Sequence, residues 1–168
     1  MDNGPKSIFV TRDITQVSST DLEGVGLIRW KDNKCYRWVE NKESATATAV
    51  GDAVYHTLTQ GLDLLKSIKL ALTANLSAQA GVAISVIPAT YFGWIQIHGA
   101  NTSIFALATS GGAIVVGDEL LGTDAQTYLK HGTTMGTAPA NARHVVALEA
   151  LATTVTVKTG IDGFIRCL

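Results

Sequence analysis

The pentapeptide Trp94-Ile95-Gln96-Ile97-His98 constrains the fold of this chain more than any other part of the sequence. Its two isoleucines fall on one face of an extended chain, whereas the Trp, Gln and His fall on the other. A glycine stands directly before it and directly after it. This period of two predicts a β-strand that lies between two different environments and is closed by glycine at both ends. Because the strand holds no catalytic pattern, it indicates a scaffold strand and an assembly protein.

Short strand-like segments recur along the chain, at the spacing typical of a barrel or a sandwich. They are residues 26–30, 35–40, 81–87, 91–98, 102–108, 113–121, 144–149, 154–158 and 164–168. Residues 61–75 fit the period of a helix and that of a strand, and we favour a strand. The expected fold is therefore all-β, a single small β-barrel or β-sandwich of the jelly-roll or β-tulip-like kind, with an extended N-terminal arm.

The first of these strands is expected to form a hairpin with the second. The hairpin spans residues 26–40 and is predicted to turn at Asp32-Asn33. A turn there places Arg29 directly opposite Tyr36 in the predicted register.

Other turn signals separate the later strands. The sequence Val50-Gly51-Asp52 is echoed by Val116-Gly117-Asp118, and each precedes an apolar segment. Glycine permits a positive φ and aspartate bonds the local backbone, so each motif predicts a tight turn that leads into a strand. The Gly- and Thr-rich residues 128–143 predict a long loop, and Ile161-Asp162-Gly163 predicts a turn.

The first 23 residues differ from the rest of the chain. They are mostly polar, and their one apolar patch is Ile8, Phe9 and Val10. We expect an extended N-terminal arm over residues 1–23, followed by one barrel or sandwich domain over residues 24–168. The patch in the arm has the composition of a short strand, which can pair with the sheet edge of a partner.

The composition limits the partners of this chain. Charged residues make up 16%, below the usual quarter, and much of the 46% hydrophobic content comes from 21 Ala, beside 20 Thr. Few solvating charges favour a state in which neighbours bury the surface, with an ordinary β-rich domain as the alternative. The net charge of −1 comes without a basic cluster, so we expect no nucleic-acid partner. The lack of an apolar signal core or membrane-length run predicts synthesis in the cytoplasm and no membrane partner.

Candidate catalytic and metal-binding residues are few and poorly placed for chemistry. The histidines, which lie at no ligand spacing from one another or from a cysteine, are His56, His98, His131 and His144. Cys35 and Cys167 are expected to be small, buried hydrophobic side chains. Asp52 and Asp118 could form a carboxylate pair for glycoside hydrolysis, but their turn sequences favour capping of the local backbone. We therefore expect no enzyme, no catalytic residue, no metal and no cofactor.

The tryptophans Trp30, Trp38 and Trp94 are the remaining candidates for function. We expect them to be core or interface anchors, with a sugar-binding platform of exposed aromatic rings as the alternative. With no catalytic motif to read, function is expected to come from assembly.

Six motifs follow one another in an order that carries a resemblance. They are Cys35-Tyr36-Arg37-Trp38-Val39, Val50-Gly51-Asp52-Ala53-Val54, Gly81-Val82-Ala83, Gly93-Trp94-Ile95-Gln96-Ile97-His98-Gly99, Val116-Gly117-Asp118-Glu119-Leu120 and Val146-Ala147-Leu148-Glu149-Ala150. In this order, over residues 24–60 and 81–168, the chain resembles small β-rich structural proteins of tailed bacteriophages, especially capsid decoration or cement proteins.

The resemblance implies a virion protein on the capsid exterior that binds the major capsid protein, clamps neighbouring subunits and stabilises the head. It also implies a homodimer or homotrimer, in which linked contacts strengthen weak binding. On this view Ile8, Phe9 and Val10 bind the capsid. Two alternatives stay open: a tail- or fibre-associated virion protein with a carbohydrate-binding surface, and a small β-barrel enzyme or ligand carrier.

Overall fold

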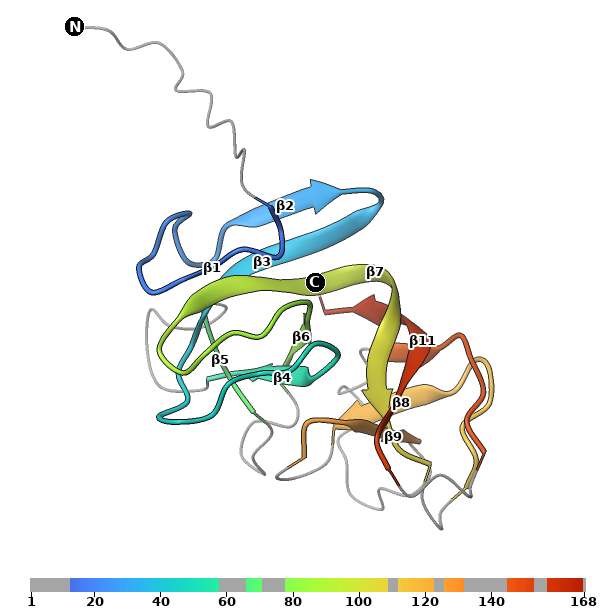
Figure 1. Ribbon diagram of the computed structural model, residues 1–168. Helices are drawn as coiled ribbons and strands as arrows, with labels where there is room; N and C mark the ends of the chain where they lie inside the picture. Colours follow the sequence, from blue (N-terminus) through green and yellow to red (C-terminus); the bar gives the residue numbers. More distant parts are fainter. Residues whose placement is uncertain are drawn as a thin grey trace, which may run out of the picture.

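The computed structural model describes residues 13–57, 66–70, 78–108, 112–122, 126–131, 145–152 and 157–167. Within these residues the chain is all-β, as expected, and forms one mixed sheet of eleven strands with no helix (Figure 1). The strands are β1 (Val17–Ser18), β2 (Ile28–Lys31), β3 (Lys34–Asn41), β4 (Ala53–His56), β5 (Ser67–Lys69), β6 (Gln79–Ala83), β7 (Phe92–Ala106), β8 (Glu119–Gly122), β9 (Leu129–His131), β10 (Val145–Ala147) and β11 (Thr159–Arg166).

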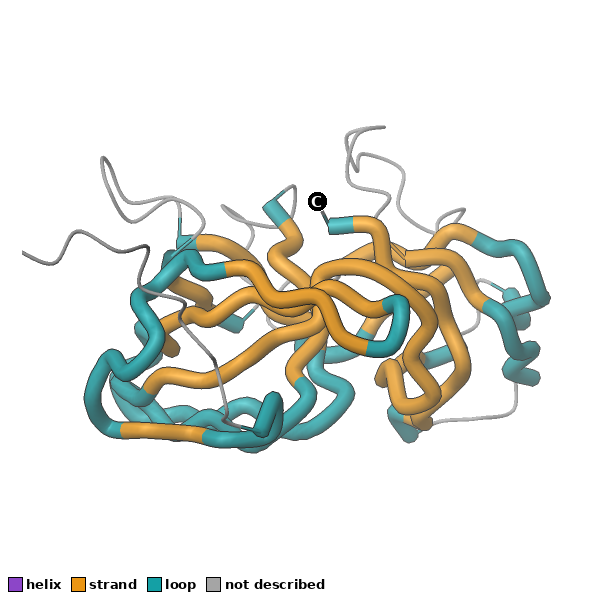
Figure 2. Tube along the Cα trace, turned by 90° about the horizontal axis from the view of Figure 1, so that it is seen from above, coloured by secondary structure: helices purple, strands orange, loops and turns teal. Residues whose placement is uncertain are grey.

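The pairings close into two rings that share the long strand β7. The first ring runs β7–β6–β4–β5–β3 and returns to β7, and the second runs β7–β11–β10–β8–β9 and returns to β7. In Figures 1 and 2 the two rings lie on either side of the bend in β7. Strands β1 and β2 are additions to the first ring, on β7 and β3 respectively.

The two rings have the same topology. In the first, β3 pairs parallel with β5, and in the second β7 pairs parallel with β9. Every other pairing within the rings is antiparallel, and each such pairing of the first ring has a counterpart in the second. The pairing β4–β5 corresponds to β8–β9, β4–β6 to β8–β10, β6–β7 to β10–β11, and β3–β7 to β7–β11. The echo of Val-Gly-Asp in the sequence therefore marks corresponding turns of two related β units.

The bend in β7 has a local cause. Gly99 has a φ of +100° and stands where the main partner of β7 changes from β3 to β11. The buried side chain of Gln96 holds the bend, because its Nε2 donates to the carbonyls of His98, Gly99 and Ala100 at 3.2, 3.1 and 3.0 Å. The two strands expected at 91–98 and 102–108 are thus one strand, since glycine here bends the ladder without ending it.

The expected alternation in the first half of β7 is confirmed. Ile95 and Ile97 lie in the main core, which runs through both rings. Trp94 lies on the opposite face, in a second cluster with Trp38 and Tyr36. The strand thus has a different apolar environment on each side.

The predicted hairpin is also confirmed. Strands β2 and β3 pair antiparallel with Arg29 opposite Tyr36. The turn residues Asp32 and Asn33 have φ values of 52° and 60°, which is the pattern of a type I′ turn.

Three other local expectations need correction. The turn expected at residues 161–163 is a bulge inside β11, because the pairing with β7 continues on both sides of it. The loop expected at 128–143 contains β9. The strand expected at 113–121 is interrupted by the turn at Gly117, and only its end forms β8. The strand favoured for the ambiguous segment 61–75 is confirmed in its described part, which contains the short strand β5.

The part of the expected arm that the structure describes belongs to the domain. Strand β1 pairs with the start of β7, and Ile14 packs against the second cluster. Asp21 Oδ1 accepts a hydrogen bond from Trp38 Nε1 at 2.8 Å. The arm boundary expected at residue 23 therefore moves toward the N-terminus, because Ile14 and Asp21 contact the cluster of Trp38 and Trp94. Residues 1–12 lie outside the described residues.

Candidate interaction surface

A row of rings, exposed at Trp30 and half-buried at His98 and Phe164, crosses three strands at the junction of the two β rings. Trp30 on β2 is 60% exposed, and its ring centroid lies 5.7 Å from that of His98 on β7. His98 in turn makes an edge-on contact of 5.2 Å with Phe164 on β11. We call Trp30, His98 and Phe164 the aromatic row. A large exposed tryptophan on such a row is the kind of residue that anchors protein–protein contacts.

The backbone fixes the place of the aromatic row. The type I′ turn sets Trp30 opposite Cys35, and Cys35 lies opposite His98. A Cβ at Gly99 would lie 2.9 Å from the carbonyl oxygen of Asn33, so only glycine lets β7 bend this close to the hairpin tip. The row is therefore presented by a rigid scaffold rather than by a mobile loop.

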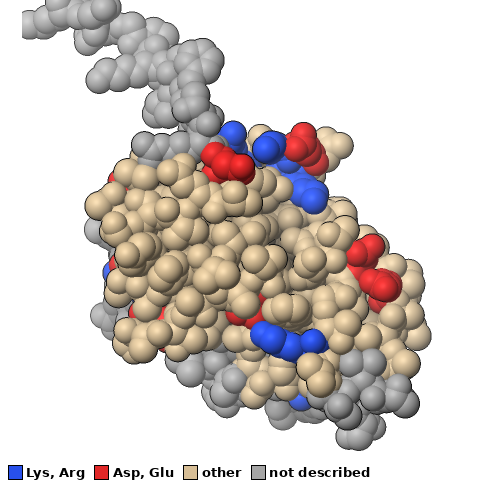
Figure 3. Space-filling model, viewed as in Figure 1, with Lys and Arg blue, Asp and Glu red and all other residues tan. Residues whose placement is uncertain are grey.

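Strand β2 lies at one end of the strand order. It pairs with β3, and Ile28 beside Trp30 is also exposed. Figure 3 shows that most of the face in view is uncharged, and that its Lys, Arg, Asp and Glu form small groups, several of them at the end of the molecule where Figure 1 shows β2. The low charged fraction of the sequence is thus visible as a broad neutral surface.

The other two tryptophans are core residues. Trp94 and Trp38 are 0% and 1% exposed, and their rings meet edge to face at 5.4 Å. The sequence placed all three tryptophans in one class, core or interface anchors. The structure separates them: Trp38 and Trp94 hold the second cluster, and Trp30 is at the surface.

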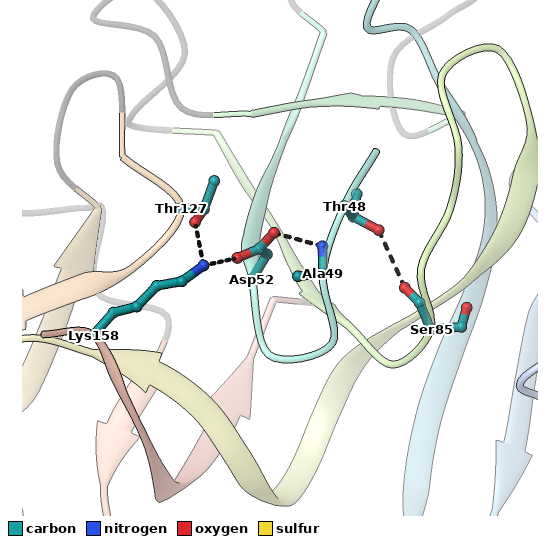
Figure 4. Close-up of polar contacts among 6 residues, drawn as sticks. All are labelled: Thr48, Ala49, Asp52, Ser85, Thr127 and Lys158. Carbon is teal, nitrogen blue, oxygen red and sulfur yellow. Dashed lines mark hydrogen bonds and ion pairs between the residues drawn. The ribbon is translucent and has the colours of Figure 1, made fainter. Parts of the chain in front are cut away.

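The two aspartates of the Val-Gly-Asp motifs cap their own turns, as expected. Asp52 Oδ2 accepts from the backbone N–H of Ala49 at 2.6 Å (Figure 4), and Asp118 Oδ2 accepts from that of Val115 at 2.8 Å. Asp52 Oδ1 also pairs with Lys158 Nζ at 3.2 Å. Because each carboxylate is used in the turn of a different ring, they do not form a hydrolytic pair.

A buried polar pair lies between β3 and β4. Arg37 and His56 are both buried, and Arg37 Nη1 lies 3.3 Å from His56 Nε2. Burial, and then the positive charge of Arg37, lowers the pKa of His56 to about 4, so the imidazole is neutral and accepts from the guanidinium. This contact gives Nε2 of the buried, neutral histidine a hydrogen-bond donor.

The other histidines and the cysteines are placed as follows. His131 Nε2 lies 3.3 Å from Asp118 Oδ2, and His144 lies outside the described residues. Cys35 and Cys167 are free and buried, and burial raises the pKa of the Cys167 thiol to about 12. Both thiols are thus protonated, inert and hydrophobic in character.

No group of three or more His, Cys, Asp or Glu side chains that could hold a metal ion occurs in the described part of the chain. The described residues also include no helix long and apolar enough to cross a membrane. The residues expected to bind a capsid, Ile8, Phe9 and Val10, lie outside the described residues.

The sequence carries little signal for two of these contacts. His98 was assigned to the same face of its strand as Trp94, but its neighbours Trp30 and Phe164 come from distant segments. The Arg37–His56 pair joins β3 and β4, which are not directly paired, so no local sequence pattern predicts it.

Comparison with known proteins gives no further assignment: no protein-family model, no curated protein and no solved structure matches the chain.

Proposed function

We propose that this protein is a capsid decoration protein, which binds the outside of a phage head and clamps neighbouring subunits of the major capsid protein. The order of the six sequence motifs supports this proposal. An all-β scaffold with a broad neutral face is also suited to a protein that buries its surface in neighbours.

The observation that carries the proposal is the aromatic row. Trp30 is exposed on a strand that is held in a tight hairpin, so little conformational entropy is lost when a partner covers it. Trp30 also has an exposed apolar neighbour, Ile28, on the same strand. Tryptophan on a rigid element is a typical energetic centre of an interface.

The first test is a quantitative mass-spectrometric survey of particles from the phage or prophage whose genome encodes the chain. Hundreds of copies per particle are expected for a shell protein. A few copies per particle would assign it to the tail, and absence from particles would refute a virion role.

The second test measures binding of the purified protein to heads that lack it. Trp30→Ala is expected to weaken binding at least about 30-fold, the effect of losing a tryptophan that dominates an interface. Val86→Ala is the matched control, because Val86 is similarly exposed but follows β6, in a different part of the first ring. Equal binding by both variants would exclude the aromatic row as the capsid contact.

One observation also favours the alternative of a tail- or fibre-associated protein. An exposed tryptophan beside two further rings is a surface on which a sugar can stack. This alternative would be supported over decoration if the free protein binds host glycans, loses that binding in Trp30→Ala, and does not bind bare heads.

A further inference from the structure

The two rings carry the same turn with the same hydrogen bonds. The N–H of Gly51 donates to the carbonyl of Ala83 at 2.9 Å, and the N–H of Gly117 donates to that of Ala147 at 2.8 Å. The reciprocal bonds, from Ala83 to Asp52 and from Ala147 to Asp118, also match, at 2.9 and 2.8 Å. With the aspartate caps described above, the turns agree in geometry, so a difference in their surroundings is informative.

The turns differ in what covers them. The carbonyl of Gly51 accepts from the N–H of Phe105 on β7 at 2.9 Å, and a Cβ at Gly51 would overlap the carbonyl oxygen of Ser103. Gly51 is therefore buried under a strand. Gly117 is exposed, a Cβ there would meet nothing within 4 Å, and no N–H of the described residues donates to its carbonyl.

The uncovered turn is apolar. Val116 is 65% exposed, and Val115 and Leu148 beside it are also exposed. The N–H of Gly117 donates to the carbonyl of Ala147, so the turn lies next to the segment that carries the exposed Leu148. We call Val115, Val116 and Leu148, with the Gly117 carbonyl, the open turn. It offers the Gly117 carbonyl as a hydrogen-bond acceptor beside exposed apolar side chains, and an extended apolar strand could supply the donor and cover those side chains.

The sequence repeats, near its start, three residues of the strand that covers the first turn. That strand reads Ser103-Ile104-Phe105-Ala106, and residues 7–10 read Ser-Ile-Phe-Val. The tripeptide Ser-Ile-Phe occurs at these two places only. The residues that the sequence expected to pair with a partner are thus the ones whose equivalents cover a turn in the first ring.

We propose that residues 7–10 of a second copy of this chain lie across the open turn as an added strand. The N–H of Phe9 donates to the carbonyl of Gly117, as that of Phe105 donates to Gly51, and the apolar side chains of the arm cover Val116. The occupant of the site is therefore this chain's own N-terminal segment, supplied by a neighbour.

The length of the arm favours exchange between copies. Phe9 lies four residues before Asp13, a reach of roughly 14 Å in a fully extended chain. The described chain starts at Asp13 and leads into β1, which pairs with the beginning of β7 on the first ring. The open turn belongs to the other ring, beyond the bend in β7 (Figures 1 and 2).

Such an exchange is head to tail, since an arm on one copy meets a turn on the next. A contact of this type builds a closed ring of copies or an open filament, according to its rotation. The open turn is separate from the aromatic row, so the inference is independent of capsid binding. It gives Ile8, Phe9 and Val10 a different partner from the capsid expected from the sequence.

Sedimentation velocity over a range of concentrations tests the proposal with the full chain. The natural protein is expected to associate beyond the 17.7 kDa of one chain. Phe9→Ser and Val116→Asp are each expected to weaken association at least about tenfold. The first removes the apolar side chain of the arm, and the second places a charge on the apolar surface of the open turn. Val50→Asp is the matched control, since Val50 occupies the corresponding position of the covered turn and is itself exposed.

Mixing the two variants is the decisive measurement. The Phe9→Ser chain keeps the turn and the Val116→Asp chain keeps the arm, so an equimolar mixture is expected to form one-to-one dimers and nothing larger. Ile8→Ser and Val115→Asp serve as second variants if either protein fails to keep the circular dichroism spectrum of the natural chain.

Three results would overturn the proposal: a natural protein that stays monomeric, a variant that associates like the natural chain, or a mixture that does not dimerise. If Phe9→Ser weakens binding to heads without changing self-association, the arm binds the capsid. The arm exchange is then wrong while capsid decoration stands.

Discussion

The paired turns allow a substitution experiment that measures how much the junction of the two rings contributes to stability. Gly51 and Gly117 have φ values of +91° and +94°, and they occupy the same position in the same turn. Alanine at either position therefore meets the same backbone strain. Only at Gly51 does the new methyl group also meet another strand, at Ser103.

The expected magnitudes follow from these two contributions. A left-handed φ costs a non-glycine residue about 1 kcal/mol, so Gly117→Ala should lower the free energy of unfolding by about that amount. At Gly51 the overlap with the Ser103 backbone adds about 1–3 kcal/mol of overpacking. If the turn moves away, the bond from Phe105 is lost as well, for about 1 kcal/mol more. Gly51→Ala should then cost about 3–5 kcal/mol in total.

Urea unfolding, followed by tryptophan fluorescence and circular dichroism, measures both values. The variants should be compared at low protein concentration, in a Phe9→Ser background, so that self-association does not contribute. Coincident transitions and an unchanged denaturant dependence would show that the comparison is valid. If the two alanines differ by less than about 0.5 kcal/mol, the first turn is not packed under β7 and the reasoning on the open turn loses its basis.

Three further results are expected. Trp94→Ala should lower the free energy of unfolding by about 3–5 kcal/mol because Trp94 is fully buried, whereas Trp30→Ala should change it by less than about 0.5 kcal/mol. Similar effects of both variants in chemical denaturation would contradict the placement of Trp94 in the core and Trp30 at the surface. The pKa of His56 lies near 4 in the folded state against 6.5 normally, so the unfolded state binds more protons between these values. The contribution of His56 to the free energy of unfolding should therefore be fully present above pH 6.5 and should be lost toward pH 4, by at most about 1.4 kcal/mol per pH unit. Urea titrations at each pH should show a shallower fall in His56→Gln. A strong chelator should leave the melting temperature unchanged, and a large decrease in a thermal scan would reveal a structural metal.

Local chemistry made several features predictable. The period of two in residues 94–98 determines which side chains share a face, whatever the strand packs against. The turn residues Asp32-Asn33 determine the hairpin register, because the preference for a type I′ turn acts over only a few residues. The same holds for the two Val-Gly-Asp turns, where the aspartate caps a backbone N–H three residues away.

Features that depend on distant partners were not predictable from the sequence. Glycine at position 99 is compatible with a strand end and with a bend, and the pairing of β11 beyond it makes it a bend. Asp162-Gly163 reads as a turn, but β7 on one side and β10 on the other keep β11 extended across a bulge. The same reason separates Trp30 from Trp38 and Trp94, since burial is set by which segments arrive to cover a side chain.

The sequence by itself thus determined the β class, the faces of its strands and the chemistry of its tight turns, because these depend on neighbours a few residues apart. The tertiary structure alone decided that β7 serves two rings, that Ile14 and Asp21 contact the Trp38–Trp94 cluster, and that one of two equivalent turns is buried while the other is open. The physical reason is that side-chain burial and strand pairing are settled by contacts between segments that lie far apart in the chain, whose arrangement no local pattern specifies.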